Sequence, residues 1–295
     1  MKKKEFGPVL FIPGLNSGKY PYCNSIYIQS HGILVDPASD RERLIRLKQE
    51  ENIRQVWLTH FHEDHIMHLD LFEDVPFYIS EMDAPQLSDI NLFMDWDWFE
   101  YKPETRDWWF TQLKEKFNYK PRKAAGFLAD GQVFTERGVT LRVIHTPGHT
   151  PGSLSFYLEE HGVLFIGDYD LTPFGPYYGD RGSSIEDTVD SIEKLRQIPA
   201  HIVLTGHEEG VFKRPGSAVW ERYVGVIRKR ENRLLEFLSS PRTMQEIVDA
   251  YIVYGRPREP KSFFELGERA LMKKHLELLI KKKMITHKNK IYRLS

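Results

Sequence analysis

The chain has little of what marks secreted and membrane proteins. It contains a single cysteine, Cys23, so an intrachain disulfide framework is excluded. No apolar run reaches the roughly 18 residues that a membrane-spanning helix needs. The basic start at residues 1–4 is followed by an apolar stretch, residues 9–12, that Pro13 and Gly14 cut short, so it is not typical of a secretory signal. We therefore expect a cytoplasmic protein that makes no membrane contact.

Net charge is also almost absent, but the formal value of −1 conceals an asymmetry. Residues 228–295 carry 17 Lys and Arg against 8 Asp and Glu, a net charge of +9, whereas residues 1–227 carry 24 against 34, a net charge of −10. Opposite charge in two parts of one chain predicts two different roles for them.

The chain up to residue 215 alternates short strand patterns with helical ones. Predicted strands cover residues 9–12, 24–29, 32–35, 55–59, 76–80, 132–134, 139–145, 153–158, 163–167 and 202–205. Predicted helices cover residues 40–50, 81–87 and 184–198. Ser39 is expected to cap the first helix, with Leu44, Ile45 and Leu47 facing inward. This rhythm predicts an α/β (α+β) fold with two half-domains of sheet, each covered by helices.

Residues 91–120 interrupt the rhythm with ten aromatic side chains. So many large rings are seldom left in water. One interpretation is a helical hairpin that packs on the core or forms a dimer contact, and a homodimer fits the second case. The other is a wall over a pocket that selects an apolar or aromatic substrate.

The densest chemistry lies in Thr59-His60-Phe61-His62-Glu63-Asp64-His65, directly after the predicted strand 55–59. His60 and His62 point to the same side of an extended segment, and we expect the chain to turn into a helix at Asp64 and His65. Imidazole nitrogens and a carboxylate oxygen are ligands that zinc and similar divalent metals prefer. The stretch therefore predicts part of a metal site.

One loop cannot surround an ion, so further ligands are expected elsewhere. His149, Asp168 and His207 each follow the end of a predicted strand and stand next to a glycine, which lets the backbone pass close to an ion. A lone histidine at a strand end is usually structural, but these residues taken with the first stretch favour a metal centre.

The order His60-x-His62-x-Asp64-His65, His149, Asp168, His207 resembles the metallo-beta-lactamase superfamily in its binuclear form, as in glyoxalase II-like thioesterases and related ribonucleases. The resemblance covers about residues 9–210 and includes Asp36, a structural residue near the site in that family. It implies an αββα sandwich. It also implies that His60, His62 and His149 hold one metal ion, that Asp64, His65 and His207 hold the other, and that Asp168 bridges them.

The resemblance implies a catalytic mechanism in which a metal-bridging hydroxide attacks the substrate, so no serine or cysteine nucleophile is required. Asp168 and Asp64 would be the catalytic carboxylates, because Asp168 holds the bridged geometry and Asp64 orients the water. The same seven ligands accept two zinc ions, and also iron or manganese.

The basic tail has a compact helical pattern of its own. A first predicted helix runs from Ala218 toward Ser239 and includes much of a linker region drawn at residues 216–227. A capping box at Thr243 then opens a second helix, a third covers residues 266–281, and a hairpin turns at residues 287–289. This order resembles a winged helix, which some lactamase-beta-like endoribonucleases of the superfamily carry. We therefore divide the chain into a catalytic domain, residues 1–215, and a winged-helix-like domain, residues 228–295.

Three functions are compatible with these patterns. The favoured one is a metal-dependent hydrolase of a small ester, thioester or lactone. The first alternative is an endoribonuclease or phosphodiesterase that holds RNA through the basic tail. The second is a binding protein that keeps the metal for structure only.

Overall fold

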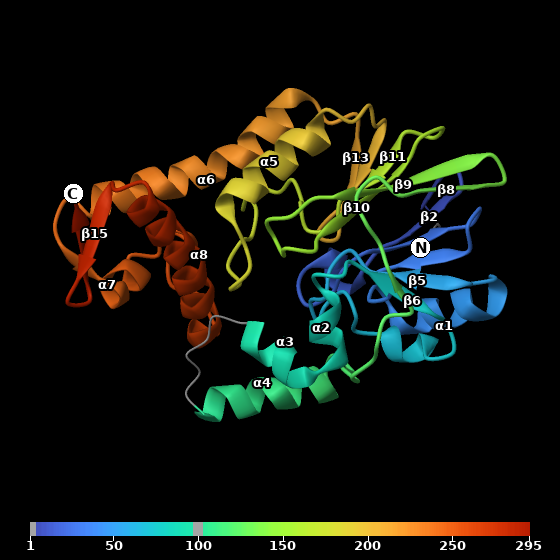
Figure 1. Ribbon diagram of the computed structural model, residues 1–295, viewed down its shortest axis with the longest axis horizontal. Helices are drawn as coiled ribbons and strands as arrows, with labels where there is room; N and C mark the ends of the chain where they lie inside the picture. Colours follow the sequence, from blue (N-terminus) through green and yellow to red (C-terminus); the bar gives the residue numbers. More distant parts are fainter. Residues whose placement is uncertain (1–3, 97–102) are drawn as a thin grey trace.

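Two β-sheets form the centre of the protein in the computed structural model, which describes residues 4–96 and 103–295 (Figure 1). The first sheet has the strand order β1 (Lys4–Phe6), β2 (Val9–Ile12), β3 (Ser25–Ile28), β4 (Ile33–Val35), β5 (Gln55–Trp57), β6 (Phe77–Ile79) and β7 (Gly126–Phe127). The second has the order β13 (Val211–Lys213), β12 (Ile202–Leu204), β11 (Val163–Phe165), β10 (Leu154–Leu158), β9 (Val139–His145) and β8 (Val133–Glu136).

Each sheet changes from antiparallel to parallel pairing near its middle. In the first sheet β1 to β4 pair antiparallel, and β4, β5, β6 and β7 then pair parallel. In the second sheet β11 and β12 are the parallel pair. Parallel strands end at the same edge, so the loops that follow β4 and β5, and those that follow β11 and β12, leave each sheet side by side.

Helices cover the outer face of each sheet, which confirms the predicted αββα sandwich (Figure 1). The core between the sheets joins Val35 and Trp57 of the first sheet to Val143 and Phe156 of the second. A second core joins the first sheet to α1 (Arg41–Glu50), α2 (Ala84–Ser88), α3 (Ile90–Trp96) and α4 (Pro103–Glu115). A third joins the second sheet to α5 (Ile185–Arg196) and α6 (Ser217–Phe237). Two short 3₁₀ helices cover Leu15–Gly18 and Leu69–Phe72.

The start of α1 differs from the prediction. Asp40, not Ser39, is the N-cap, because its side chain accepts a hydrogen bond from the Arg43 N–H at 3.0 Å. Leu44 and Leu47 are buried as expected, whereas Ile45 is exposed. The apolar face of this helix is thus narrower than the sequence pattern indicates.

The aromatic-rich region forms helices α3 and α4, which pack on the first sheet. Phe93, Leu113 and Tyr119 are buried in the core under this sheet, and Trp109 packs against it. Trp108 is 55% exposed. Trp98, Phe99 and Tyr101 lie outside the described residues, so core packing is observed only for the flanking parts of the region.

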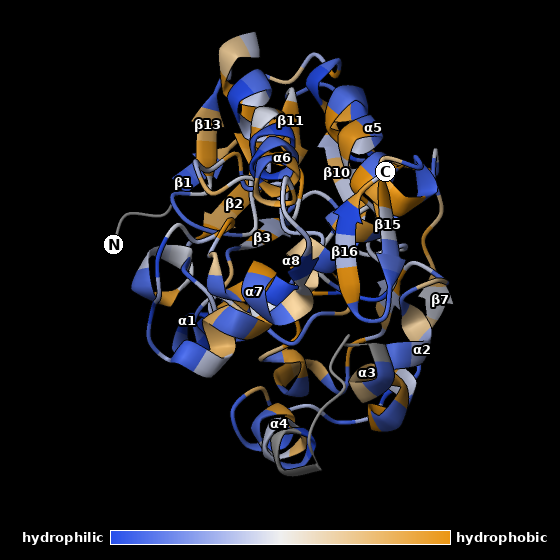
Figure 2. Ribbon diagram, turned by 90° about the vertical axis from the view of Figure 1, so that its left-hand side faces the viewer, coloured by the Kyte–Doolittle hydropathy of each residue, from blue (hydrophilic) through white to orange (hydrophobic). Residues whose placement is uncertain are grey.

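The tail is built on α6, α7 (Met244–Asp249), α8 (Lys261–Lys281) and a three-stranded sheet (Figures 1 and 2). That sheet has the order β14 (Arg242–Thr243), β16 (Ile291–Leu294), β15 (Ile285–Lys288). The capping box of Thr243 and Glu246 is confirmed. The hairpin is also confirmed, but it turns one residue later than predicted, at Asn289 and Lys290, which both have positive φ.

One helix joins the tail to the sandwich. α6 is continuous from Ser217 to Phe237, so the boundary drawn at residue 228 lies inside it. Assignment of the tail as a winged helix stays a prediction. Among the helices of residues 4–96 and 103–295, none combines the length and the apolar character needed to cross a membrane.

Candidate metal centre

The seven predicted ligands lie on four loops at one end of the sandwich. His60, His62, Asp64 and His65 follow β5, and His149 follows β9. Asp168 follows β11 and His207 follows β12, the parallel pair of the second sheet. The Leu154 N–H donates to the Thr59 carbonyl at 2.9 Å and joins the β5 loop to the opposite sheet. The fold therefore brings together all seven residues from distant parts of the chain.

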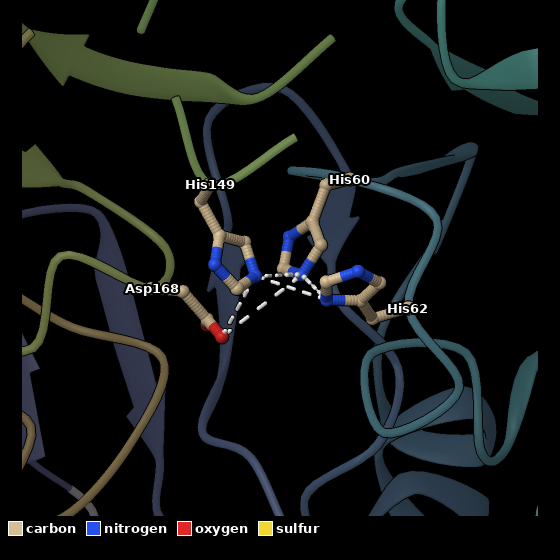
Figure 3. Close-up of side chains that lie close together, drawn as sticks. All are labelled: His60, His62, His149 and Asp168. Atoms are coloured by element: carbon tan, nitrogen blue, oxygen red, sulfur yellow. Dashed lines mark hydrogen bonds and ion pairs between the residues drawn. The ribbon is translucent and has the colours of Figure 1, made fainter. Parts of the chain in front are cut away.

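Three imidazole rings converge in the first group of donors (Figure 3). His60 Nε2 lies 3.0 Å from His62 Nδ1, and His149 Nε2 lies 3.1 Å from His60 Nε2 and 2.9 Å from His62 Nδ1. Asp168 Oδ2 lies 3.3 Å from His149 Nε2 and 4.0 Å from His60 Nε2. The four residues enclose a single point.

Asp64, His65 and His207 form the second group, and Asp168 lies between the two groups. His207 Nε2 is 3.2 Å from Asp64 Oδ2 and 3.5 Å from Asp168 Oδ2. His65 Nε2 is 2.8 Å from Asp168 Oδ1. Asp168 Oδ1 thus faces His65, and Asp168 Oδ2 lies near histidines of both groups.

These donors fit divalent metal ions. Ligand atoms about 2.1 Å from a tetrahedral zinc ion are spaced about 3.4 Å apart, close to the separations in the first group. Three ring nitrogens in mutual contact cannot satisfy one another by hydrogen bonds, because each neutral ring has one N–H. His65 Nε2 and Asp168 Oδ1 are buried without a hydrogen-bond partner, although they face each other. A shared cation would satisfy all of these atoms.

In each of the five histidines, the ring nitrogen that faces away from the centre contacts an oxygen atom of another residue. The contacts are His60 Nδ1 to Thr59 Oγ1 at 2.9 Å, His62 Nε2 to Asp180 Oδ2 at 2.6 Å, His65 Nδ1 to Asp36 Oδ2 at 2.9 Å, His149 Nδ1 to the Tyr177 carbonyl at 3.1 Å, and His207 Nδ1 to the Gly18 carbonyl at 2.9 Å. Such contacts place the proton on the outer nitrogen and turn the inner lone pair toward a metal.

Asp36 anchors the β5 loop from the next strand of the first sheet. Its Oδ1 accepts a hydrogen bond from the Thr59 N–H at 2.8 Å, and its Oδ2 accepts one from the Thr59 hydroxyl at 2.7 Å. Because the Thr59 hydroxyl donates to Asp36, it is free to accept the His60 Nδ1–H. One buried carboxylate therefore orients two histidines.

Burial and mutual charge shift the pKa values of the centre strongly. Burial opposes ionisation of Asp168, but His65 and His207 outweigh it and hold the pKa of this carboxyl well below its usual value. Burial and the neighbouring His65 keep the pKa of His60 well below the usual value. Burial would also lower the pKa of His62, but Asp180 raises it to about 10. An ionised Asp168 beside a neutral His60 suits metal ligation.

Glycine is required beside two of the ligands. A Cβ on Gly206 would lie 2.7 Å from Asp168 Oδ1, which leaves no room for a side chain. Gly148 has a φ of +129°, and a Cβ there would lie 2.4 Å from the Thr188 nitrogen. The glycines next to His207 and His149 therefore let the ligand loops approach one another.

One local expectation is wrong. The chain does not turn into a helix at Asp64 and His65: residues 63–65 form a turn, and the next helical element starts at Leu69. Glu63 in this turn is half-buried and accepts a hydrogen bond from the Tyr20 hydroxyl at 2.8 Å. Burial, with the adjacent Asp64, raises the pKa of Glu63 to about 7.

Several residues around the centre have no signal in the sequence pattern. Asp180 and Tyr177 belong to the loop between β11 and α5 and reach His62 and His149. Asp83 accepts hydrogen bonds from the Thr150 hydroxyl at 2.6 Å and the Gly152 N–H at 2.9 Å, and so holds the His149 loop. Asp170 accepts one from the His207 N–H at 2.9 Å. Asp170 has a weak signal, because it lies two residues after the predicted ligand Asp168. The sequence pattern contains no signal for Asp180, Tyr177 or Asp83.

A family model described as the metallo-beta-lactamase superfamily matches residues 20–207, more than half of the chain. The chain belongs to this superfamily. The matched range contains all seven residues of the two donor groups.

Two curated relatives align with parts of the chain. A probable polyketide biosynthesis zinc-dependent hydrolase from Bacillus velezensis is 44% identical over 91 residues, which are 30% of this chain and 39% of that protein. An atrochrysone carboxyl ACP thioesterase from Pseudocercospora fijiensis is 28% identical over 68% of this chain and 51% of its own length. The chain thus spans about two fifths and about half of the lengths of these two relatives.

Solved structures share the fold of the whole chain. A metallo-beta-lactamase family protein from Thermus thermophilus has a TM-score of 0.73 at 23% identity, with 98% of this chain and 99% of that one covered. A beta-lactamase domain protein from Burkholderia ambifaria has a TM-score of 0.71 at 16% identity, with 100% of this chain and 94% of that one covered. The tail therefore has a counterpart in other members of the fold.

Proposed function

We propose that this protein is a two-metal hydrolase that cleaves a thioester or a related small ester or lactone. The observation that carries the proposal is the position of Asp168 between two histidine-rich donor groups, with carboxylate oxygens close to histidines of both. The seven residues would hold two divalent ions, and zinc is the proposed metal because nitrogen donors predominate.

Two ions at this centre would lower the pKa of a water molecule and polarise the substrate carbonyl, which is the chemistry that hydrolysis needs. Side chains of the protein would orient that water molecule. Burial raises the pKa of Asp64, but the hydrogen bond from His207 and the charge of His65 outweigh it and keep the pKa low. Asp64 is then a carboxylate at neutral pH, able to accept a hydrogen bond from the attacking water and hold it in line.

A thioester is the preferred substrate class for two reasons. A thiol has a pKa of about 8.5, so a thiolate leaves without a proton donor at its sulfur. A relative aligned over two thirds of this chain bears the name of an acyl carrier protein thioesterase, and a polyketide zinc hydrolase also aligns. The low pKa of a thiol leaving group and the names of the aligned relatives both favour an acyl group carried on sulfur.

The test is hydrolysis of a panel of acyl thioesters, aryl esters and lactones, with bis-p-nitrophenyl phosphate as the phosphodiester. Metal content is measured on the same protein samples. Turnover of thioesters with two bound metal ions supports the proposal. Turnover of the phosphodiester alone would move the protein to the nuclease class, and silence on the whole panel would favour a binding role.

An RNA-directed activity is the second candidate, and one observation favours it. Five exposed basic residues of the tail lie at the end of α8 and on the hairpin: Lys282, Lys283, Lys288, Lys290 and Arg293. Contacts of such a patch with phosphates weaken steeply as salt rises. A salt titration of single-stranded RNA binding tests this candidate, and no affinity at low salt removes it.

A further inference from the structure

The segment between β11 and α5 supports two ligands from behind. Its residues 171–183, called here the support segment, contain no helix or strand within the described chain. Tyr177 presents its carbonyl to His149 Nδ1 at 3.1 Å, and Asp180 presents Oδ2 to His62 Nε2 at 2.6 Å. A segment without helix or strand is held in shape by hydrogen bonds to its surroundings. The side chains that form these hydrogen bonds therefore fix the positions of the Tyr177 carbonyl oxygen and Asp180 Oδ2.

Arg230 of α6 binds the first half of the support segment. Its guanidinium donates from Nη1 to the Pro176 carbonyl at 2.9 Å and from Nη2 to the Phe174 carbonyl at 2.7 Å. It also donates to the Tyr178 hydroxyl at 3.1 Å and lies over the Phe174 ring, 4.7 Å from its centroid. Arg230 is only 3% exposed. A buried charge is costly unless its donors are used, and here Nη1 and Nη2 are used on residues around Tyr177, whereas Nε has no hydrogen-bond partner.

Lys274 of α8 binds the second half. Its Nζ donates to the Arg181 carbonyl at 2.8 Å and to the Ser183 carbonyl at 2.7 Å, and the residue is 7% exposed. Ser183 continues the contact toward the centre, because its hydroxyl donates to the His149 carbonyl at 2.6 Å and accepts from the Asp180 N–H at 3.0 Å. Lys274 thus fixes the backbone directly after Asp180.

The next residue of α8, His275, also contacts the support segment. His275 Nε2 lies 2.9 Å from the Tyr178 hydroxyl, and both side chains are buried. The Pro176 carbonyl and the Tyr178 hydroxyl, on either side of Tyr177, and the Arg181 carbonyl after Asp180 are therefore held by α6 and α8, two helices of the tail.

We propose that the tail is part of the scaffold of the metal centre, with Arg230 and Lys274 as positioning residues that hold His62 and His149 through the support segment. The inference rests on the metal site proposed above. It is specific to one group of ligands: the contacts of Arg230 and Lys274 lead through the support segment to His62 and His149, whereas Asp36 and the Gly18 carbonyl support His65 and His207.

The experiment compares Lys274→Met and Arg230→Lys with Lys281→Met in the full chain. Lys274→Met keeps most of the unbranched side chain and removes the donors to the Arg181 and Ser183 carbonyls. Arg230→Lys keeps the charge and removes the fork that spans the two carbonyls. Lys281 also lies on α8, but its pair with Glu186 at 2.7 Å is exposed, so Lys281→Met is the matched control.

Two metal affinities are measured by chelator competition with zinc, and cobalt absorption reports the coordination of each group. Loss of an outer contact of a ligand typically weakens metal binding about 10- to 100-fold. We expect at least about a 10-fold loss at the three-histidine group in both variants, with the Asp64, His65 and His207 group and Lys281→Met unchanged. Circular dichroism verifies the fold of each variant.

Unchanged affinities in both variants would overturn the inference and leave the proposed function intact. Equal weakening of both groups would also overturn it, because that result describes general destabilisation. A wild-type protein that binds no zinc would remove the proposed metal site itself, so the two failures are distinguishable. If Arg230→Lys does not fold, Lys274→Met alone decides.

Discussion

Asp36 Oδ2 lies 2.9 Å from His65 Nδ1, and both side chains are completely buried. The carboxylate comes from the end of β4 and the imidazole from the loop after β5, so the pairing of two parallel strands sets this distance. A carboxylate at this position keeps the proton on Nδ1 and leaves Nε2 to face Asp168.

Asp36→Asn should weaken metal binding at the second group about 10- to 100-fold, because an amide NH₂ no longer accepts the His65 Nδ1–H. Asparagine tolerates the positive φ of 50° at this position, so the backbone is preserved. Zinc competition on the purified variant measures the effect. Asp70→Asn, which affects only the partly exposed pair with Arg41, is the control. Wild-type affinity in Asp36→Asn would contradict the role given to this carboxylate.

Asp168→Ala should remove most activity, by at least about 100-fold, and reduce bound metal at both groups while the fold is retained. The reason is that both donor groups lose their shared oxygen ligand. Metal analysis and thioester turnover are measured on the same sample. Asp249→Ala on α7 is the control, since that residue is exposed. Full activity in Asp168→Ala would refute its assignment as the bridging ligand.

His68 should make the metal-free protein sensitive to acid. Burial, with the nearby Arg41, lowers the pKa of His68 to about 4 in the folded state, against about 6.5 when unfolded. The unfolded chain therefore binds a proton first, and stability present above pH 6.5 is lost as the pH falls toward 4. The contribution is about 2 kcal/mol between pH 7.5 and pH 5.

His68→Gln should remove this contribution, because glutamine does not titrate. Urea unfolding with chelator present at both pH values measures the difference in free energy of unfolding. His201→Gln, at an exposed position, should behave as wild type. An identical pH dependence in wild type and His68→Gln would show that the buried histidine is not the sensitive group.

Phe93→Ala should destabilise the fold by about 3 kcal/mol. The side chain is buried in the core under the first sheet and contacts Phe61 edge-to-face with ring centroids 5.3 Å apart. Trp108→Ala should change the free energy of unfolding by no more than about 0.5 kcal/mol, because that ring is mostly exposed. Denaturant unfolding measures both. Equal effects would mean that the aromatic region does not pack as a core element.

The residues that converge at the candidate centre could be predicted from the sequence where the chemistry of a side chain is unusual for its place. His60 to His65 could be found because four metal-binding side chains within six residues have few structural explanations. Asp168 and His207 could be found because a polar residue beside glycine closes each of two apolar strands. The sandwich follows from the same strand and helix rhythm.

The remaining features depend on contacts between residues far apart in sequence. Asp180 lies in a stretch without regular structure, and its relation to His62, 118 positions earlier, exists only after the sheets have closed. Asp40 rather than Ser39 caps α1, and Ile45 is exposed next to the buried Leu44. The local pattern does not distinguish between the two capping residues or between the two apolar side chains.

The continuity of α6 decides how far this protein is modular. Trp220 and Tyr223 near its start belong to the core of the sandwich, whereas Leu234 near its end, with Leu238 directly after it, belongs to the core of the tail. A chain shortened at residue 228 would keep half a helix and expose apolar surface on both sides of the cut. The sandwich and the tail therefore cannot be exchanged as independent units. A functional chimera would have to be joined after Phe237 or before Ser217, and the core of the sandwich or of the tail would have to be rebuilt.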